Sequence, residues 1–198
     1  MWNNTLDLGF SLNHFVDKSV VEIGCGPAGI STVLRAKLKV GLDPLVQDYR
    51  KDFNMNTDDC EYVLARGENI PIRDGAIDVV FCVNVLDHVM DPNWVLGEAR
   101  RILRENGVMI LGVTIHSQVS AGDASTLESH WSEPFKKIYR NLNELGRRRI
   151  AHPHRFRDED VFITIKDQGY EIERCVLKSI LHGNRFEAVF MTMVCKRT

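Results

Sequence analysis

The chain has 198 residues, of which 44% are hydrophobic and 26% are charged, and its formal net charge is −2. This composition excludes a disordered chain and predicts one packed domain over residues 1–198. The lack of a basic excess argues against nucleic acid as a partner, and the lack of a long apolar run argues against insertion in a membrane. No signal-peptide pattern opens the sequence, so the expected location is the cytoplasm.

Cysteine usage agrees with a reducing compartment. The chain has five cysteines, which are widely spaced and mostly embedded in apolar runs. An odd number of such residues is typical of free, buried thiols rather than of a disulfide framework. This prediction covers Cys25, Cys60, Cys82, Cys175 and Cys195.

Short apolar runs alternate with helical patterns along the first half of the chain. They predict strands over residues 19–23, 38–42, 62–65, 77–83 and 108–113. Strands that alternate with helices form parallel sheets, and continuously apolar strands are covered by helices on both faces. The predicted architecture is therefore an α/β/α sandwich of three layers.

Two helices are predicted within this half. One starts near Ala28, directly after a glycine-rich turn, and the other covers residues 92–104. Asp91 can cap the second helix, and Pro92 suits its first turn. The dipeptide Asn106–Gly107 is a suitable stop for this helix.

The end of the chain returns to regular structure. A helix is predicted over residues 158–168, followed by strands over residues 170–177 and 188–195. Gly183–Asn184 lies between the two strands and favours a tight connection. The two strands should therefore form an antiparallel hairpin.

The pattern breaks between the fifth strand and the last helix. Residues 117–157 are polar and predict an insertion with helical pieces. Trp131, Phe135 and Tyr139 recur at four-residue spacing, as along one face of a helix. We interpret the insertion as a lid over an acceptor site, with core packing of the aromatic residues as the alternative.

The strongest local signal is an apolar strand that runs into a G-x-G-x-x-G turn. Gly24, Gly26 and Gly29 carry this pattern, with Cys25 inside it. Glycines let the backbone turn tightly and approach a ligand closely. Alone, the pattern fits sites for NAD, FAD or S-adenosylmethionine, and also a turn without a ligand.

Two acidic residues indicate which of these ligands fits the glycine turn. Asp43 ends the second predicted strand, where a carboxylate can accept hydrogen bonds from both ribose hydroxyls of an adenosine ligand. Glu22 stands just before the first glycine, where a negative charge would repel a pyrophosphate. A ligand with an amino group and a sulfonium suits Glu22 better than a dinucleotide does.

Three further segments carry a resemblance to a known family. They are Glu68–Val80 (ENIPIRDGAIDVV), Val85–Val89 (VLDHV) and Leu96–Leu103 (LGEARRIL). With the EIGCG turn and Asp43, they resemble the class I S-adenosylmethionine-dependent methyltransferases, particularly the small-molecule group that includes the ubiquinone and menaquinone methyltransferases. The resemblance spans residues 19–113. It implies a Rossmann-like, seven-stranded, mostly parallel sheet with an antiparallel last strand, S-adenosylmethionine as cofactor and S-adenosylhomocysteine as product.

The resemblance also implies roles for single residues. The glycine turn would shape the cofactor loop, and Glu22 would help to orient the methionine amino end. Asp43 would hold the ribose, the backbone of Gly67 would meet the adenine, and the carbonyl of Asn84 would receive the ammonium group. The full set implied to contact the cofactor is Glu22, Gly24, Cys25, Gly26, Gly29, Asp43, Pro44, Gly67, Glu68, Asn84 and Val85.

Two positions depart from the family pattern. Residues 104–107 (RENG) replace a lysine-proline-glycine-glycine turn, which changes only the stop of a helix. Arg66 stands where many relatives carry an aspartate that accepts the adenine amino hydrogen. Glu68 is the candidate substitute for that aspartate.

Histidines are the main candidates for the site that binds the methyl acceptor. A general base would help a hydroxyl acceptor to react, and His88 and His116 follow the fourth and fifth predicted strands at the ligand-facing edge. The predicted acceptor contacts are Tyr139, His152, His154 and Arg155. The arginines of residues 147–157 can bind an anionic acceptor or form a solvated face. No third and fourth ligand stand near His152 and His154, so no metal is predicted.

The sequence thus predicts a methyltransferase that acts on a small molecule, with an oxygen acceptor on an anionic or sugar-like metabolite favoured. One alternative is a non-catalytic S-adenosylmethionine-binding regulatory partner. A second alternative is an NAD-dependent oxidoreductase, which shares the glycine turn and Asp43 but leaves Glu22 unexplained. A homodimer is the expected assembly if a second subunit covers the cofactor.

Overall fold

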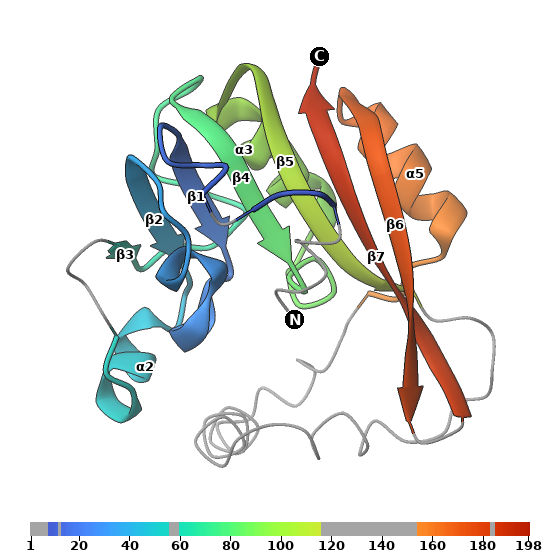
Figure 1. Cartoon of the computed structure of the whole chain (residues 1–198), viewed down its shortest axis with the longest axis horizontal. Helices are drawn as coiled ribbons and strands as arrows, with labels where there is room; N and C mark the ends of the chain where they lie inside the picture. Colours follow the sequence, from blue (N-terminus) through green and yellow to red (C-terminus); the bar gives the residue numbers. More distant parts are fainter. Residues whose placement is uncertain (1–7, 12, 56–59, 116–153, 183–184) are drawn as a thin grey trace.

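The computed structural model describes residues 8–11, 13–55, 60–115, 154–182 and 185–198, with the backbone alone at Asp158, residues 179–182 and residues 185–188. These residues form one seven-stranded sheet with the strand order β3-β2-β1-β4-β5-β7-β6 (Figure 1). The strands are β1 (Ser19–Ile23), β2 (Leu38–Leu42), β3 (Glu61–Val63), β4 (Ile77–Val83), β5 (Leu103–Ile115), β6 (Tyr170–His182) and β7 (Arg185–Arg197). The helices are η1 (Gly26–Ala28), η2 (Ile30–Thr32), α2 (Val46–Asp52), α3 (Pro92–Ile102) and α5 (Asp158–Asp167).

The pairing of the strands confirms the predicted sheet. β1, β2, β3, β4 and β5 pair in parallel. β7 runs antiparallel to both β5 and β6, which confirms the predicted hairpin and the antiparallel last strand. The sheet is the Rossmann-like one that the resemblance implied.

The two faces of the sheet are covered differently (Figure 1). On one face, α3 and α5 bury Val95, Leu96, Ala99, Val161 and Ile165 against the strands. On the other face, the segment before β1 and the turn η2 provide the covering residues Leu8, Phe10, Phe15 and Ile30. The second covering layer among the described residues is therefore made of short turns rather than of long helices.

The predicted helix near Ala28 is wrong. The chain instead forms two 3₁₀ turns, η1 and η2, separated by Gly29 in an extended conformation. The backbone N–H groups of Ile30 and Ser31 are bound by the side chain of Glu22. This side chain takes two donors of the segment and fixes it as a compact turn.

The helix α3 confirms its predicted start but not its end. The Asp91 side chain accepts a hydrogen bond of 2.8 Å from the Asn93 N–H, and Pro92 occupies the first turn. The helix ends at Ile102, because Leu103 already pairs with Ile77 of β4. Asn106, at a φ of 58°, lies within β5.

Two smaller differences concern α2 and Cys175. The helix α2 was not predicted, although its buried residues Val46 and Tyr49 have helical spacing. Four of the five cysteines are buried as free thiols, but Cys175 is exposed because β6 is the outer strand of the sheet. Most of the predicted insertion, with Trp131 and Phe135, lies outside the described residues. No helix in the described ranges is long and apolar enough to cross a membrane.

Candidate cofactor-binding site

The carboxyl ends of the parallel strands lie along one edge of the sheet, and most of the predicted cofactor residues are in the segments that follow these ends (Figure 1). The glycine loop follows β1, Asp43 follows β2, Gly67 follows β3 and Asn84 follows β4. The chain order of the strands reverses between β1 and β4, since β2 lies on one side of β1 and β4 on the other. Open α/β sheets bind ligands at such a switch point.

The glycine loop needs its first two glycines for their backbone conformation. Gly24 has a φ of 66° and Gly26 a φ of 55°, in the left-handed region that disfavours other residues. A Cβ at Gly24 would also lie 2.4 Å from Cγ2 of Val85. The loop after β1 and the segment after β4 are therefore packed directly on each other.

Gly29 is required for a different reason. Its φ is −69°, which any residue adopts, but a Cβ there would lie 2.3 Å from Oε2 of Glu22 and 2.6 Å from the carbonyl oxygen of Cys25. The loop is thus pressed against the buried Glu22 carboxylate. Burial raises the pKa of Glu22 to about 7, while hydrogen bonds from Ser31 and Ile30 lower it in part.

Asp43 binds the same loop from its other side. One carboxylate oxygen accepts the Gly26 N–H at 3.1 Å, and the other accepts the Leu45 N–H at 2.8 Å. The side chain is buried, and burial raises its pKa. Pro44 beside it is exposed. Cys25 is buried, and burial raises the pKa of its thiol, so it fills space rather than acting as a nucleophile.

The segment after β3 forms a tight turn from Arg66 to Asn69. Gly67 is buried, and a Cβ there would lie 3.0 Å from Cγ2 of Ile23 and 3.1 Å from Cγ1 of Val95. One oxygen of Glu68 accepts the Met90 N–H at 2.8 Å. Arg66 is exposed and contacts the sulfur of Met90.

Asn84 directly follows β4 and has a φ of 56°, which is rare for a residue other than glycine. Its N–H donates to the Gly112 carbonyl at 2.9 Å. Its Oδ1 atom is buried, and no described residue donates a hydrogen bond to it. A left-handed backbone and a buried acceptor without a donor are features of a ligand site.

The acceptor-side residues are partly brought together. His88 follows β4, and its Nε2 lies 3.8 Å from Oδ1 of the buried Asp87. His154 contacts the Val89 carbonyl through Nε2 at 2.9 Å, so it packs on the segment that carries His88. Arg155, next to His154, is exposed. His116, Tyr139 and His152 lie outside the described residues, as do the arginines of residues 147–149.

Two features were not predicted. The Arg101 guanidinium binds the carbonyl oxygens of Ile70 and Ile72 and the carboxylate of Glu98, and so fixes the segment that follows Glu68.

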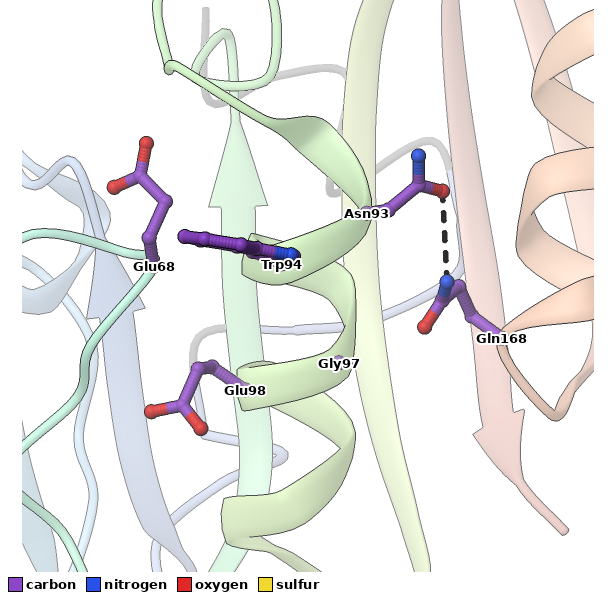
Figure 2. Close-up of a pocket in the computed structure, with 6 residues that line it drawn as sticks. All are labelled: Glu68, Asn93, Trp94, Gly97, Glu98 and Gln168. Atoms are coloured by element: carbon purple, nitrogen blue, oxygen red, sulfur yellow. Dashed lines mark hydrogen bonds between the residues drawn. The ribbon is translucent and has the colours of Figure 1, made fainter.

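A shallow hollow of about 490 Å³ lies on the outer face of α3 (Figure 2). Trp94 and Glu68 line it, as do Asn93 and Gln168, and the Gln168 side-chain amide donates a hydrogen bond of 3.4 Å to the Asn93 Oδ1 atom. Only Glu68 belongs to both the hollow and the predicted cofactor set. Within the described residues, no group of three or more metal-ligating side chains is present.

Comparison with known proteins shows that part of this chain is similar to a known family. Residues 21–111 match the model of the family described as Methyltransferase domain. An uncharacterized methyltransferase of Mycobacterium sp. (strain KMS) is 32% identical over 101 residues, which are 50% of this chain and 39% of that protein. The tRNA U34 carboxymethyltransferase of Campylobacter jejuni is 32% identical over 108 residues, which are 50% of this chain and 36% of that protein.

The fold comparison agrees. A solved structure of geranyl diphosphate methyltransferase in complex with SAM matches with a TM-score of 0.60 at 12% identity, over 93% of this chain and 79% of that one. The chain spans less than two fifths of the two curated relatives above. The matched residues begin inside β1, end inside β5 and include the whole glycine loop and Asp43. Residues 21–111 are therefore similar to the Methyltransferase domain family, and the fold is that of solved S-adenosylmethionine-dependent methyltransferases.

Proposed function

We propose that the chain binds S-adenosylmethionine over β1 and β2 and transfers its methyl group to a small molecule. The observation that carries this proposal is the position of Asp43 against the glycine loop, with one oxygen on the Gly26 N–H and the other on the Leu45 N–H. A carboxylate has about four acceptor positions, so about two stay open for the two hydroxyls of a ribose. Asp43 would therefore hold the loop and the ribose together.

The other residues fit the remaining parts of this cofactor. The buried Oδ1 atom of Asn84 offers an acceptor beside the left-handed backbone where the methionine ammonium is expected. The turn that contains Gly67 would border the adenine, with Glu68 beside it in place of the family aspartate. Glu22 beneath the loop favours a cationic ligand over a pyrophosphate, which disfavours the NAD-dependent alternative.

The cofactor supplies a methyl group on a sulfonium, which reacts by in-line displacement. The protein then has to align the acceptor, exclude water and remove a proton from a hydroxyl. His88 is the proposed base, because it follows β4 at the ligand-facing edge and Asp87 lies 3.8 Å away. His154 and Arg155 would border the acceptor.

A small anionic or sugar-like acceptor is supported by the exposed Arg155 and Arg157 and by the proximity of His154 to the His88 segment. The name of the Campylobacter relative supports a second candidate, which is tRNA. The net charge of −2 favours the small molecule, because tRNA binding gains from a basic surface. A homodimer and a single-domain organisation stay predictions, and light scattering of the purified chain checks the first.

The test is a turnover assay with methyl-labelled S-adenosylmethionine. The purified chain is incubated with pools of hydroxylated, anionic and sugar-like metabolites and, separately, with unmodified tRNA. Label transfer to a metabolite, lost in His88→Gln and kept in Lys51→Gln on the exposed face of α2, supports the proposal. Label transfer to tRNA alone replaces the small-molecule acceptor by the second candidate.

Calorimetric titration of the same chain with S-adenosylmethionine and with NAD, beside the turnover assay, distinguishes the remaining alternatives. Tight binding of S-adenosylmethionine without transfer to any pool identifies a non-catalytic regulatory partner. Binding of NAD without binding of S-adenosylmethionine contradicts the proposal as a whole.

A further inference from the structure

One buried side chain holds the glycine loop from below. Oε1 of Glu22 accepts the Ile30 N–H and Oε2 accepts the Ser31 N–H, both at 2.9 Å. Glu22 is only 3% exposed, and the loop approaches it so closely that Gly29 has no room for a Cβ. Both oxygens of this carboxylate are therefore engaged by the loop that would contact the cofactor.

The surroundings of Glu22 leave its negative charge only partly compensated. Its two hydrogen bonds come from neutral backbone groups, which stabilise a carboxylate less than a cation does. Burial outweighs these bonds and raises the pKa of Glu22 to about 7, and the nearby Asp43 raises it further. The other titratable groups that face this region are Cys25 in the loop, Cys60 before β3, Tyr62 in β3 and, next to Cys60, Lys39 in β2.

We propose that Glu22 is a positioning residue that couples the shape of the cofactor loop to the charge of the ligand. It holds Ile30 and Ser31 in place, and it gives up a proton when a cationic ligand binds above Gly24 and Gly26. The inference rests on the proposed function for the identity of the ligand. The effect of Glu22 on the loop does not depend on that identity.

The sign of the effect follows from linkage. Without ligand, Glu22 is partly protonated near neutral pH, and a nearby positive charge favours its ionised form. Because the bound state holds fewer protons than the free state, affinity rises with pH. We expect S-adenosylmethionine to bind about tenfold more tightly at pH 8 than at pH 6, with the dependence levelling off above pH 7. S-adenosylhomocysteine lacks the sulfonium charge and should show a shallower dependence.

Calorimetric titration of the whole chain tests the coupling. At pH 7, S-adenosylmethionine is titrated in two buffers of different ionisation enthalpy, which reports the protons released on binding. We expect about half a proton per site in the wild type. Glu22→Gln keeps the shape of the side chain and cannot titrate, so it should release none and bind with an affinity independent of pH. Unchanged proton release in this variant overturns the coupling, because Asp43 or another group is then its source.

Amide hydrogen exchange, measured by nuclear magnetic resonance without ligand, tests the positioning role. In Glu22→Gln one of the two loop N–H groups loses its acceptor, so exchange at Ile30 or Ser31 should become faster. The Leu45 amide, which donates to Asp43 instead, is the internal control and should be unchanged. Equal exchange at Ile30 and Ser31 in both proteins overturns the positioning role.

The titration tests whether the chain binds the cofactor, and the amide exchange tests whether Glu22 holds the loop without a ligand. Failure of the wild type to bind either ligand at any pH overturns the proposed function, and the coupling with it, whereas the exchange result still decides the role of Glu22 in the loop. Should Glu22→Gln fail to fold, the two-buffer titration of the wild type still tests whether binding releases any proton. Binding without release or uptake of protons overturns the coupling.

Discussion

At the amino edge of the sheet, the Asp78 carboxylate joins the starts of β1 and β4, whereas at the carboxyl edge Glu22 and Asp43 join β1 and β2 to the glycine loop. Asp78 accepts hydrogen bonds of 2.7 Å from the N–H and the hydroxyl of Ser19, and Arg104 lies 2.5 Å from its other oxygen. Glu22 and Asp43 accept their hydrogen bonds from backbone N–H groups.

Folding lowers the pKa of Asp78 at the amino edge and raises the pKa values of Glu22 and Asp43 at the carboxyl edge. Burial alone would raise the pKa of Asp78, but the bonds from Ser19 and the ion pair with Arg104 outweigh it and lower the pKa below 3.8. Burial raises the pKa of both Glu22 and Asp43, because neutral donors do not offset the loss of water. A carboxylate matched by a cation stabilises the fold. Two carboxylates without such a match, placed at a ligand-facing edge, indicate a site for a ligand that brings charge or donors.

Of the substitutions at the two edges of the sheet, Asp43→Ala at the carboxyl edge should have the largest effect, which is a loss of cofactor affinity. The variant removes the proposed ribose acceptor and two hydrogen bonds to the loop, so the affinity for S-adenosylmethionine should fall by at least about 100-fold, or about 3 kcal/mol. Calorimetric titration measures this loss. Asp48→Ala removes the same charge from the exposed first turn of α2 and should leave the affinity within about twofold. Equal losses in the two variants would mean that long-range charge, not contact, controls binding.

Part of this edge was predictable from the sequence. The proximity of Asp43 to the glycine loop was predictable, because both follow buried parallel strands whose carboxyl ends meet at one edge. β1, β2 and β4 have their predicted bounds, since each is a continuously apolar run of ordinary strand length. The contacts of the implied cofactor residues with a ligand stay predictions.

Other features depended on tertiary contacts that no local pattern records. The helix expected near Ala28 is replaced by 3₁₀ turns, because Glu22, several residues earlier, binds the Ile30 and Ser31 amides. The Glu98 and Arg101 contacts to the segment after Glu68 depend on where α3 lies on the sheet. The exposure of Cys175 depends on β6 being the outer strand. The spacing of residues along the sequence does not determine these tertiary contacts.

A second, smaller effect concerns stability against pH at the carboxyl edge. The pKa of Glu22 rises from 4.5 to about 7 on folding, so the folded chain binds a proton that the unfolded chain has released in this window. The stability from this group is complete below pH 4.5 and is lost as pH rises through about 7, by about 3 kcal/mol. Urea unfolding followed by circular dichroism at pH 5 and pH 8 should show this loss in the wild type and a smaller loss in Glu22→Gln. Parallel pH profiles would contradict the raised pKa.

The smallest effect should come from Asp78→Asn at the amino edge. The amide keeps an acceptor for Ser19 but loses the ion pair with Arg104, whose side chain is half exposed, so we expect a loss of about 1 kcal/mol in the free energy of unfolding at pH 7. Because folding lowers the pKa of Asp78, its contribution is present above pH 3.8 and is lost as pH falls through the lower folded value. The wild type and the variant should therefore converge in stability under acid. Cofactor affinity should not change, since β1 and β4 separate this residue from the glycine loop. A tenfold loss of affinity in Asp78→Asn would show that the two edges are coupled through these strands, and that the division of roles between their carboxylates is wrong.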